Sequence, residues 1–337
     1  MVAFHFRDAY PSETAFPRLQ PFLQFGASGV DLFFVLSGYL IAGLILSEWR
    51  ETGGLDARRF WRRRWMRTLP AYYAVLTTLA LGDLVRRPDH PWQNFFSYWV
   101  FLPAYATDLV AWRFSWCWSL CVEEWFYLLL PVLVLRLHAL RQGMSPERIL
   151  RIIAAGAVLL SVLARLHMFV LRRSGAVDGY TAWWTIYWVT HYRLDGLAVG
   201  VFVATLRKPR STVWALALAA AAFAVLLTQV WVDGAAIPAY DFQKFLLTAL
   251  AFGVLVYVSA GDNPWARTRI AGAPFIANLS YSLYLVHPIL LRLVAELSSA
   301  HPYVGQLALV PLTLAVAMLL RHSVELPFIR LRDRFAS

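Results

Sequence analysis

Apolar residues occupy long blocks along almost the whole chain, and short polar segments separate these blocks. Blocks of roughly 18 to 22 apolar residues predict transmembrane helices, because each is long enough to cross a bilayer core of about 30 Å. Residues 92–106 are apolar but short and contain Pro103, which favours an interfacial or re-entrant segment. The pattern predicts nine full spans, at residues 28–47, 68–85, 116–137, 149–171, 185–206, 211–231, 243–260, 275–297 and 303–321.

The composition also favours a membrane protein over a soluble one. Of the 337 residues, 59% are hydrophobic and only 15% are charged, and soluble domains of this size rarely reach such values. The 15 Trp and 15 Tyr residues suit the two interfaces of a bilayer, although many would simply pack between helices. No soluble domain, internal repeat or low-complexity tail is visible, so we expect residues 1–337 to form one all-α, polytopic transmembrane helical bundle.

The positive charge of the chain has a membrane explanation. The net charge is +11, and nearly all basic residues are arginines in short segments between apolar blocks. Topology and phospholipid headgroups account for such positions, so nucleic acid is not an expected partner. On one side of the predicted spans lie 20 basic residues, against about 10 on the other. This excess places the first side, which includes the C-terminus, in the cytoplasm of a multi-pass cell-membrane protein.

The number of spans conflicts with the first residues of the chain. Nine spans that end in the cytoplasm place residue 1 on the opposite side of the membrane. Residues 1–6 nevertheless have the apolar pattern of the last turns of a membrane helix. We therefore expect a bundle of about ten helices whose first helix is truncated in this sequence, through a wrong start codon or a genuine truncation.

Several carboxylates lie inside apolar blocks, where an unpaired charge is expensive. We expect Asp31 to hold an arginine or a catalytic histidine, or to cap the start of its helix. Glu123 has two interpretations: it orients and stabilises an imidazolium, or it is the structural partner of a buried arginine such as Arg165 or Arg193. Asp195 is expected to pair with Arg193 or with another buried arginine.

A dense run of arginines precedes the second predicted span, and Arg63, Arg64 and Arg67 lie at its cytoplasmic end. Arg64 and Arg67 share one helical face because they are three residues apart. Guanidinium groups bind phosphates through paired hydrogen bonds, so these arginines are candidates for contact with a phosphorylated ligand. The alternative is the ordinary excess of positive charge on the cytoplasmic side of a membrane protein.

The sequence offers no metal site. Cys117 and Cys121 lie four residues apart on one apolar helix without accompanying histidine or acidic ligands, so packing is the favoured interpretation. The chain also lacks a Gly-rich phosphate loop, a His-Glu-x-x-His zinc pattern and a Gly-x-Ser-x-Gly elbow. We therefore expect neither a metal nor a bound cofactor.

Six short segments, each weak alone, together indicate a family. Their order and spacing make the chain resemble the acyltransferase-3 family over nearly its whole length. The segments are Phe4-His5-Phe6, the run from Gly29 to Tyr39, the run from Arg63 to Pro70, the run from Trp118 to Tyr127, the run from Ser280 to Pro288, and Glu325-Leu326-Pro327.

The resemblance implies an enzyme that moves an acyl group from a cytoplasmic acyl-CoA, as co-substrate, to a hydroxyl of an extracytoplasmic or membrane-embedded acceptor. From its residue type alone, the favoured interpretation of His5 is a histidine at a helix end that bonds a backbone carbonyl. The resemblance reverses this, because His5 matches the family's essential histidine and an imidazole suits removal of the alcohol proton. Glu123 matches the family's acid, and Arg63, Arg64 and Arg67 would hold the phosphates of CoA. The family also carries an arginine further upstream of its histidine than the four residues that precede His5 here.

Asp31, Ser37 and His287 are further candidates along the substrate path. Ser37 would bond the carbonyl four residues back, as hydroxyls in membrane helices commonly do, and a role as nucleophile is the less favoured alternative. His287 precedes a proline in an apolar helix and either lines the acceptor path or is a packing histidine. Glu325 is expected to close a salt bridge.

We therefore predict an integral membrane O-acyltransferase that transfers an acyl group, with acetyl favoured, to a hydroxyl of a surface polysaccharide, a glycolipid or an exported small molecule. Its expected partners are acyl-CoA, the carbohydrate or lipid-linked acceptor, and the bilayer. The alternatives are a membrane carrier or flippase, which would use the same buried charges, and a catalytically inactive paralogue. Transporters often consist of two matching halves, which are not visible in this sequence, so the enzyme is favoured.

Overall fold

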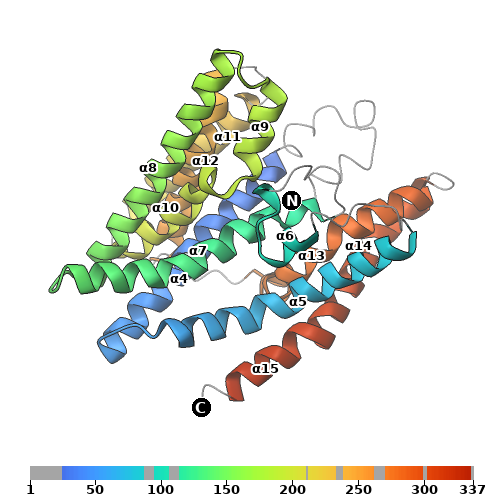
Figure 1. The fold of residues 1–337 in the computed structure, drawn as a ribbon, viewed down its shortest axis with the longest axis horizontal. Helices are drawn as coiled ribbons and strands as arrows, with labels where there is room; N and C mark the ends of the chain where they lie inside the picture. The colour runs from blue at the N-terminus through green and yellow to red at the C-terminus, as the bar shows by residue number, and fades with distance from the viewer. Residues whose placement is uncertain are drawn as a thin grey trace.

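The computed structural model describes residues 25–86, 95–105, 114–209, 212–232, 238–261, 270–298 and 302–334. These residues form helices joined by short turns, and no β-strand occurs among them. The prediction of an all-α bundle is confirmed. Figure 1 shows two groups of helices, with α8 to α12 on one side and α5 and α13 to α15 on the other, while α4 and α7 pass between them.

The helices follow the predicted spans closely, within a few residues at most ends. The long helices are α4 (Gly29–Thr52), α5 (Ala57–Arg86), α7 (Trp118–Leu140), α8 (Pro146–Arg173), α11 (Thr212–Val232), α12 (Pro238–Ser259), α13 (Ala273–Ser298) and α14 (Pro302–Leu320). The shorter helices are α6 (Phe95–Trp99), α9 (Gly179–Trp188), α10 (Leu194–Ala204) and α15 (Leu326–Arg334). Single turns complete the described chain: η1 (Gly26–Ser28), η3 (Pro103–Tyr105), η5 (Ser115–Cys117), η6 (Thr190–Tyr192) and the π-helical η8 (Arg321–Glu325).

Five helical segments in the described part of the chain are long and apolar enough to cross a membrane. This agrees with a multi-pass membrane protein. The short α6 and η3 fall in the segment expected not to cross, as their lengths require. The five segments are Gly26–Thr52, Ala57–Val85, Pro146–Arg173, Ala273–Val294 and Leu309–Arg334.

The single span predicted at residues 185–206 is wrong, because the chain breaks there. Helix α9 ends at Trp188, η6 occupies Thr190–Tyr192, and α10 begins only at Leu194. Carbonyl groups that the break frees from the helical pattern accept hydrogen bonds from buried arginine side chains. Hydropathy alone gave no sign of this, because the residues on both sides of the break are apolar.

Helix α5 begins eleven residues before the span predicted at 68–85, so the arginine-rich segment is helical as well. The side chain of Asp56 accepts hydrogen bonds from the backbone N–H groups of Arg58 and Arg59, at 2.9 and 3.1 Å. An aspartate in this position satisfies N–H groups that have no partner in the first turn of a helix. The arginines therefore project from a helix and not from a loop.

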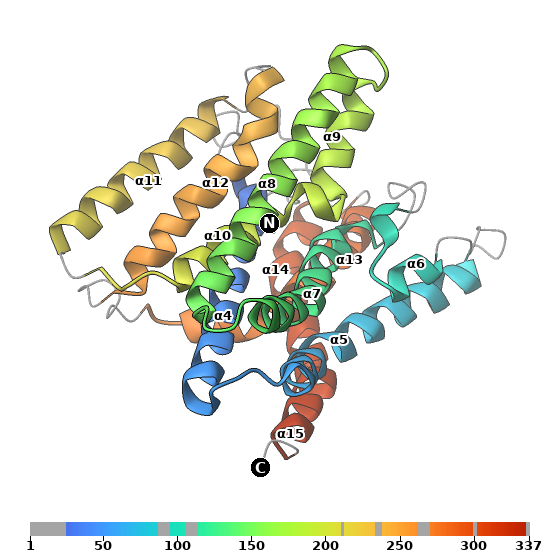
Figure 2. The same ribbon diagram turned by 60° about the vertical axis from the view of Figure 1, so that its left-hand side comes forward.

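Helices α4 and α10 pack with almost no space between their backbones, and Figure 2 shows them side by side in the middle of the molecule. A Cβ atom added to Gly38 would lie 2.0 Å from the carbonyl oxygen of Leu197, and one added to Gly200 would lie 2.0 Å from that of Val35. Small residues permit such close approach in membrane helices. This contact fixes α4 against α10 and so positions the polar side chains of both.

Candidate active site

The predicted site residues lie mainly at the middle of the molecule, on α4, α5 and α7. Glu123 projects from the first half of α7 and is only 2% exposed. His5, the expected general base, lies outside the described residues.

The hydroxyl of Tyr127 connects three helices at this point. It donates a hydrogen bond to Glu123 Oε1 at 2.7 Å, accepts one from Arg64 Nη2 at 2.7 Å, and lies 2.5 Å from the hydroxyl of Ser37. A phenol has one hydrogen, and Tyr127 uses it on Glu123, so Ser37 is the donor in the third bond. We call Ser37, Arg64, Glu123 and Tyr127 the Glu123 cluster.

The guanidinium of Arg64 also lies over the ring of Tyr127, with its Cζ atom 4.2 Å from the ring centroid. Arg64 therefore compensates the buried acid through Tyr127 and not through a direct ion pair. Its Nε atom is buried and makes no hydrogen bond within the described part of the chain. The three predicted phosphate-binding arginines are thus divided: Arg64 turns inward, while Arg63 and Arg67 remain exposed.

Glu124 faces a different set of helices from Glu123, because adjacent residues point about 100° apart around a helix. Its Oε1 atom accepts a hydrogen bond from the hydroxyl of Thr68 at 3.0 Å. The carbonyl of Thr68 in turn accepts one from the hydroxyl of Tyr281 on α13, at 2.8 Å. The Oε2 atom of Glu124 is buried without a hydrogen-bond partner among the described residues. Around Arg64 the protein therefore buries two carboxylates.

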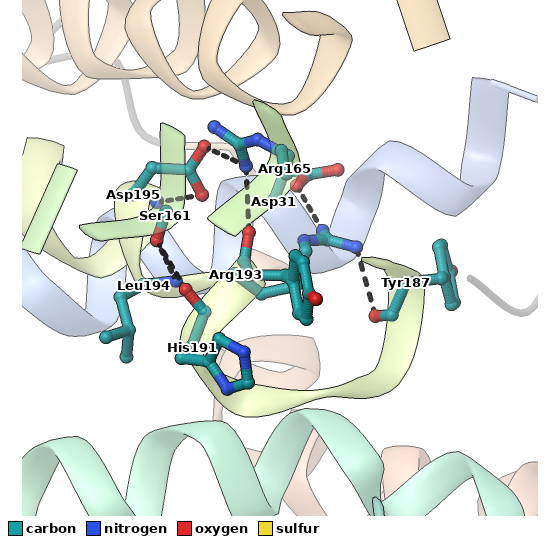
Figure 3. Close-up of polar contacts among 10 residues, drawn as sticks. Asp31, Ser161, Arg165, Tyr187, His191, Arg193, Leu194 and Asp195 are labelled. Atoms are coloured by element: carbon teal, nitrogen blue, oxygen red, sulfur yellow. Dashed lines mark hydrogen bonds and ion pairs between the residues drawn. The ribbon is translucent and has the colours of Figure 1, made fainter. Parts of the chain in front are cut away.

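A second polar group lies near the start of α4 and is shown in Figure 3. Arg193 Nη2 lies 2.6 Å from Asp31 Oδ1, and Arg165 Nη1 lies 2.7 Å from Asp195 Oδ2. All four residues are buried. We call Asp31, Arg165, Arg193 and Asp195 the Arg193 cluster. The guanidinium of Arg193 also lies 3.8 Å from the ring centroid of Phe245, a geometry that suits a buried cation.

The same arginines hold the break between α9 and α10. Arg165 donates to the carbonyl of Tyr192 at 2.8 Å, and Arg193 lies 3.4 Å from that of Tyr187. Ser161 donates to the carbonyl of His191 at 3.0 Å and accepts from the backbone N–H of Leu194 at 3.2 Å (Figure 3). Two side chains of α8, together with Arg193 just before α10, thus replace hydrogen bonds that the broken helix lacks.

The Arg193 cluster decides several alternatives left open by the sequence. Asp31 holds an arginine, and the start of α4 has no side-chain cap. Asp195 pairs with Arg165. Because Arg165 and Arg193 pair with aspartates, neither is the structural partner of Glu123. Glu123 is instead held by the hydroxyl of Tyr127, which Arg64 also contacts.

Other candidates have less direct links to Glu123. The partner of Ser37 is Tyr127 of another helix and not the expected backbone carbonyl. His287 is 1% exposed, and its Nδ1 atom lies 2.9 Å from the carbonyl of Tyr284 and 3.1 Å from that of Leu283. This contact fits the packing interpretation. Glu325 forms the expected salt bridge, with Arg321 at 3.4 Å, and also accepts a hydrogen bond from Ser282.

Sequence reasoning missed Tyr127, although its segment carries the family resemblance. The available signal was spacing, because Tyr127 follows Glu123 by four residues and therefore lies on the same helical face. Cys117 and Cys121 are buried and form no disulfide, in agreement with packing. Within the described ranges, no group of three His, Cys, Asp or Glu side chains is arranged to hold a metal ion.

Residues 1–322 match the model of the acyltransferase-3 family, described as an acyltransferase domain. The chain belongs to this family. The match includes the segments that contain Arg64, Glu123 and Tyr127, so the Glu123 cluster is part of the family's domain and not an addition to it.

Curated relatives are found in Staphylococcus aureus. The protein of strain COL named "Putative O-acetyltransferase SACOL0978" is 28% identical over 90% of this chain and 52% of its own length. The O-acetyltransferase OatA of strain NCTC 8325 / PS 47 is 27% identical over 78% of this chain and 45% of its own length. The chain therefore spans about half the length of the relatives it matches. No solved structure matches it.

Proposed function

We propose that this chain is a membrane O-acyltransferase that moves an acyl group, with acetyl favoured, from acyl-CoA to a hydroxyl of its acceptor. The observation that carries the proposal is the Glu123 cluster: a buried carboxylate bound to a tyrosine hydroxyl and an arginine, in a chain of the acyltransferase-3 family. The names of the relatives, which are O-acetyltransferases, support oxygen as the acceptor atom and acetyl as the group transferred.

The proposed reaction needs one base. His5 takes the proton from the acceptor hydroxyl as that oxygen attacks the thioester carbon. The tetrahedral intermediate then expels the CoA thiolate, and the imidazolium returns the proton to sulfur. Glu123 orients the imidazole and stabilises its positive charge, as the acid does in other nucleophile-activating pairs. His5 lies outside the described residues, so its role rests on the family resemblance and on this chemistry.

The arginines of α5 divide into two tasks in this proposal. Arg63 and Arg67 are exposed at the start of the span and bind the phosphates of CoA. Arg64 holds the hydroxyl of Tyr127 and so fixes the geometry around Glu123. We propose a sugar hydroxyl of a surface polysaccharide, a glycolipid or an exported small molecule as the acceptor. A cell-membrane location, with the C-terminus in the cytoplasm, completes the proposal.

The test is an assay of the purified full chain in lipid vesicles with acetyl-CoA labelled in the acetyl group. Transfer of label to a glycan acceptor and release of free CoA are measured together. His5→Ala should abolish transfer while the protein is still produced and folded. If His5→Ala protein transfers acetyl groups at the normal rate, the proposed mechanism is wrong.

A carrier remains the second candidate because of one observation, the break between α9 and α10. Broken helices with buried charges form the substrate sites of many transporters. The vesicle assay separates the two functions, since a carrier would move an acyl or sugar compound across the membrane without releasing CoA. CoA release that depends on the acceptor supports the enzyme, and it also excludes an inactive paralogue.

A further inference from the structure

A groove of about 620 Å³ lies between α8, α10 and α12, and no residue of either polar cluster is part of its lining. Its lining is hydrocarbon except for the guanidinium of Arg151 and the hydroxyl of Tyr257. The small side chains of Ala154 and Ala155 leave the space open along α8. At its floor, Gly253 brings α12 against α10, since an added Cβ would lie 2.5 Å from Val199 Cγ1.

The groove has the length of one leaflet of a bilayer. Along α8 it extends from Arg151 to Val162, which corresponds to about 16 Å at 1.5 Å per residue. The hydrocarbon core of a bilayer is about 30 Å thick, so this is about half of it. A chain lying in the groove would therefore reach from one polar surface to the middle of the membrane.

The two polar groups of the lining lie at the same end. Phe245, near the start of α12, packs in one cluster with Met168, near the end of α8. The two helices are therefore antiparallel, and Tyr257, at the end of α12, lies beside Arg151 at the start of α8. The opposite end of the groove is apolar.

The charge at this end is fixed in place and exposed. Arg151 donates from Nε to the hydroxyl of Thr205 at 2.9 Å and from Nη2 to its carbonyl at 2.8 Å, and neither bond uses Nη1. Leu206 lines the groove, and the two residues that follow it, Arg207 and Lys208, are exposed. Three cations therefore stand at the polar end of an apolar channel.

We propose that this groove binds one acyl chain of an anionic glycerophospholipid of the surrounding bilayer, with the lipid phosphate beside Arg151. The length supports a lipid from a single leaflet, because its chain ends where the leaflet ends. The position of the cations supports an anionic headgroup, since basic residues near a membrane surface attract anionic lipids. The proposal does not depend on the proposed acyl transfer.

The test measures the lipid that stays bound to the purified full chain. Protein in detergent is equilibrated with equal amounts of phosphatidylglycerol and phosphatidylcholine, and the retained lipid is identified and quantified by native mass spectrometry. The wild-type chain should retain phosphatidylglycerol in preference. Equal retention of both lipids, or a stronger preference for a polyprenyl phosphate added in a second arm, would overturn the proposal.

Two neighbouring leucines provide a matched pair of variants. Leu159 lines the groove, whereas Leu160 points elsewhere, and both are exposed, at 57% and 48%. Leu159→Trp should lower lipid occupancy on the order of tenfold, whereas Leu160→Trp should leave it unchanged. Ala155→Trp, which fills the groove directly, should act like Leu159→Trp. Equal losses at Leu159 and Leu160 contradict a specific groove.

The headgroup contact has its own variant. Replacing Arg207 and Lys208 together with Gln leaves the bonds between Arg151 and Thr205 intact. It should reduce the preference for phosphatidylglycerol on the order of 30-fold, since each of the two basic residues near the surface contributes about 1 kcal/mol. Crosslinking of wild-type protein to a phospholipid with a photoreactive chain end checks the position without any variant. Labels at the apolar end of the groove, near Val162, support the proposal, and labels confined to other helices oppose it.

Discussion

The Arg193 cluster and the Glu123 cluster share helix α4 but satisfy their buried charges in opposite ways. In the Arg193 cluster, two arginines meet two aspartates in direct ion pairs. In the Glu123 cluster, the hydroxyl of Tyr127 stands between the arginine and the acid, and the adjacent Glu124 adds a second carboxylate. The first arrangement has balanced charge and holds the backbone together. The second places two acidic side chains around one arginine, an arrangement that can stabilise a positive charge that forms during a reaction.

This difference gives each cluster a different expected response to mutation. A balanced pair that loses one partner leaves an uncompensated buried charge, so its loss appears as instability. A carboxylate that acts on a reacting group affects the rate first, because its neighbours already hold it in place.

The largest effect is expected from Arg193→Ala. This change leaves Asp31 buried without its partner and removes the bond to the carbonyl of Tyr187, so it should cost about 3–5 kcal/mol of folding free energy. Thermal unfolding of the purified chain in detergent should show a much lower midpoint, or the protein should fail to accumulate. The double variant Asp31→Leu with Arg193→Met removes both charges of the pair, so it should recover much of the lost stability. A stable Arg193→Ala chain would show that the cluster does not hold the fold.

Glu123→Gln should instead spare the fold and remove the activity. The amide keeps the shape and accepts the bond from Tyr127, but it cannot stabilise an imidazolium, so the transfer rate should fall about 100-fold or more. Glu124→Gln is the matched control, since it changes the neighbouring acid, which bonds to Thr68. Acetyl transfer and the unfolding midpoint are measured for both. A larger loss of rate in Glu124→Gln than in Glu123→Gln would show that Glu124, and not Glu123, is the catalytic acid.

Tyr127→Phe should have a smaller, mixed effect. It removes the hydroxyl that Glu123, Arg64 and Ser37 share, and leaves polar atoms buried without partners at a cost of about 1–3 kcal/mol. We expect the transfer rate to fall about tenfold with a modest drop in the unfolding midpoint. Tyr73→Phe, which removes a single bond to the carbonyl of Trp99, should behave like wild type. If Tyr127→Phe and Tyr73→Phe have equal effects, the hydroxyl of Tyr127 does not organise the Glu123 cluster.

The smallest effect is expected at the exposed arginines. Arg67→Gln should raise the KM for acetyl-CoA several-fold and leave kcat almost unchanged, because it removes a contact with the phosphates and not with the reacting atoms. Arg58→Gln, an exposed position at the start of the same helix, is the control and should not change KM. A donor that lacks the nucleotide phosphates should abolish the difference between Arg67→Gln and wild type. If it does not, Arg67 has another role.

The pattern of apolar residues along the chain was sufficient to predict the helices, but it did not predict the break between α9 and α10. Each span was visible because about 20 apolar residues in succession suit a bilayer wherever they occur. The break was not, since the groups that replace its hydrogen bonds, Ser161 and Arg165, come from α8. A pattern read within one segment contains no information about partners in another.

The candidate site shows the same limit. The sequence indicated that Glu123 is a buried acid and that Asp31 needs a partner such as an arginine, because a carboxylate inside an apolar block needs compensation. It could not show that Arg64, and not its neighbours Arg63 and Arg67, turns inward to Tyr127.

By itself, then, the sequence determined a helical membrane protein of the acyltransferase-3 type and the residues whose burial is expensive. The tertiary structure decided which of these residues compensate one another, and it formed the lipid-facing groove between α8, α10 and α12. The physical reason is that hydropathy depends on neighbours along the chain. Ion pairing instead depends on neighbours in space, and Asp31 meets Arg193 across 162 positions of sequence.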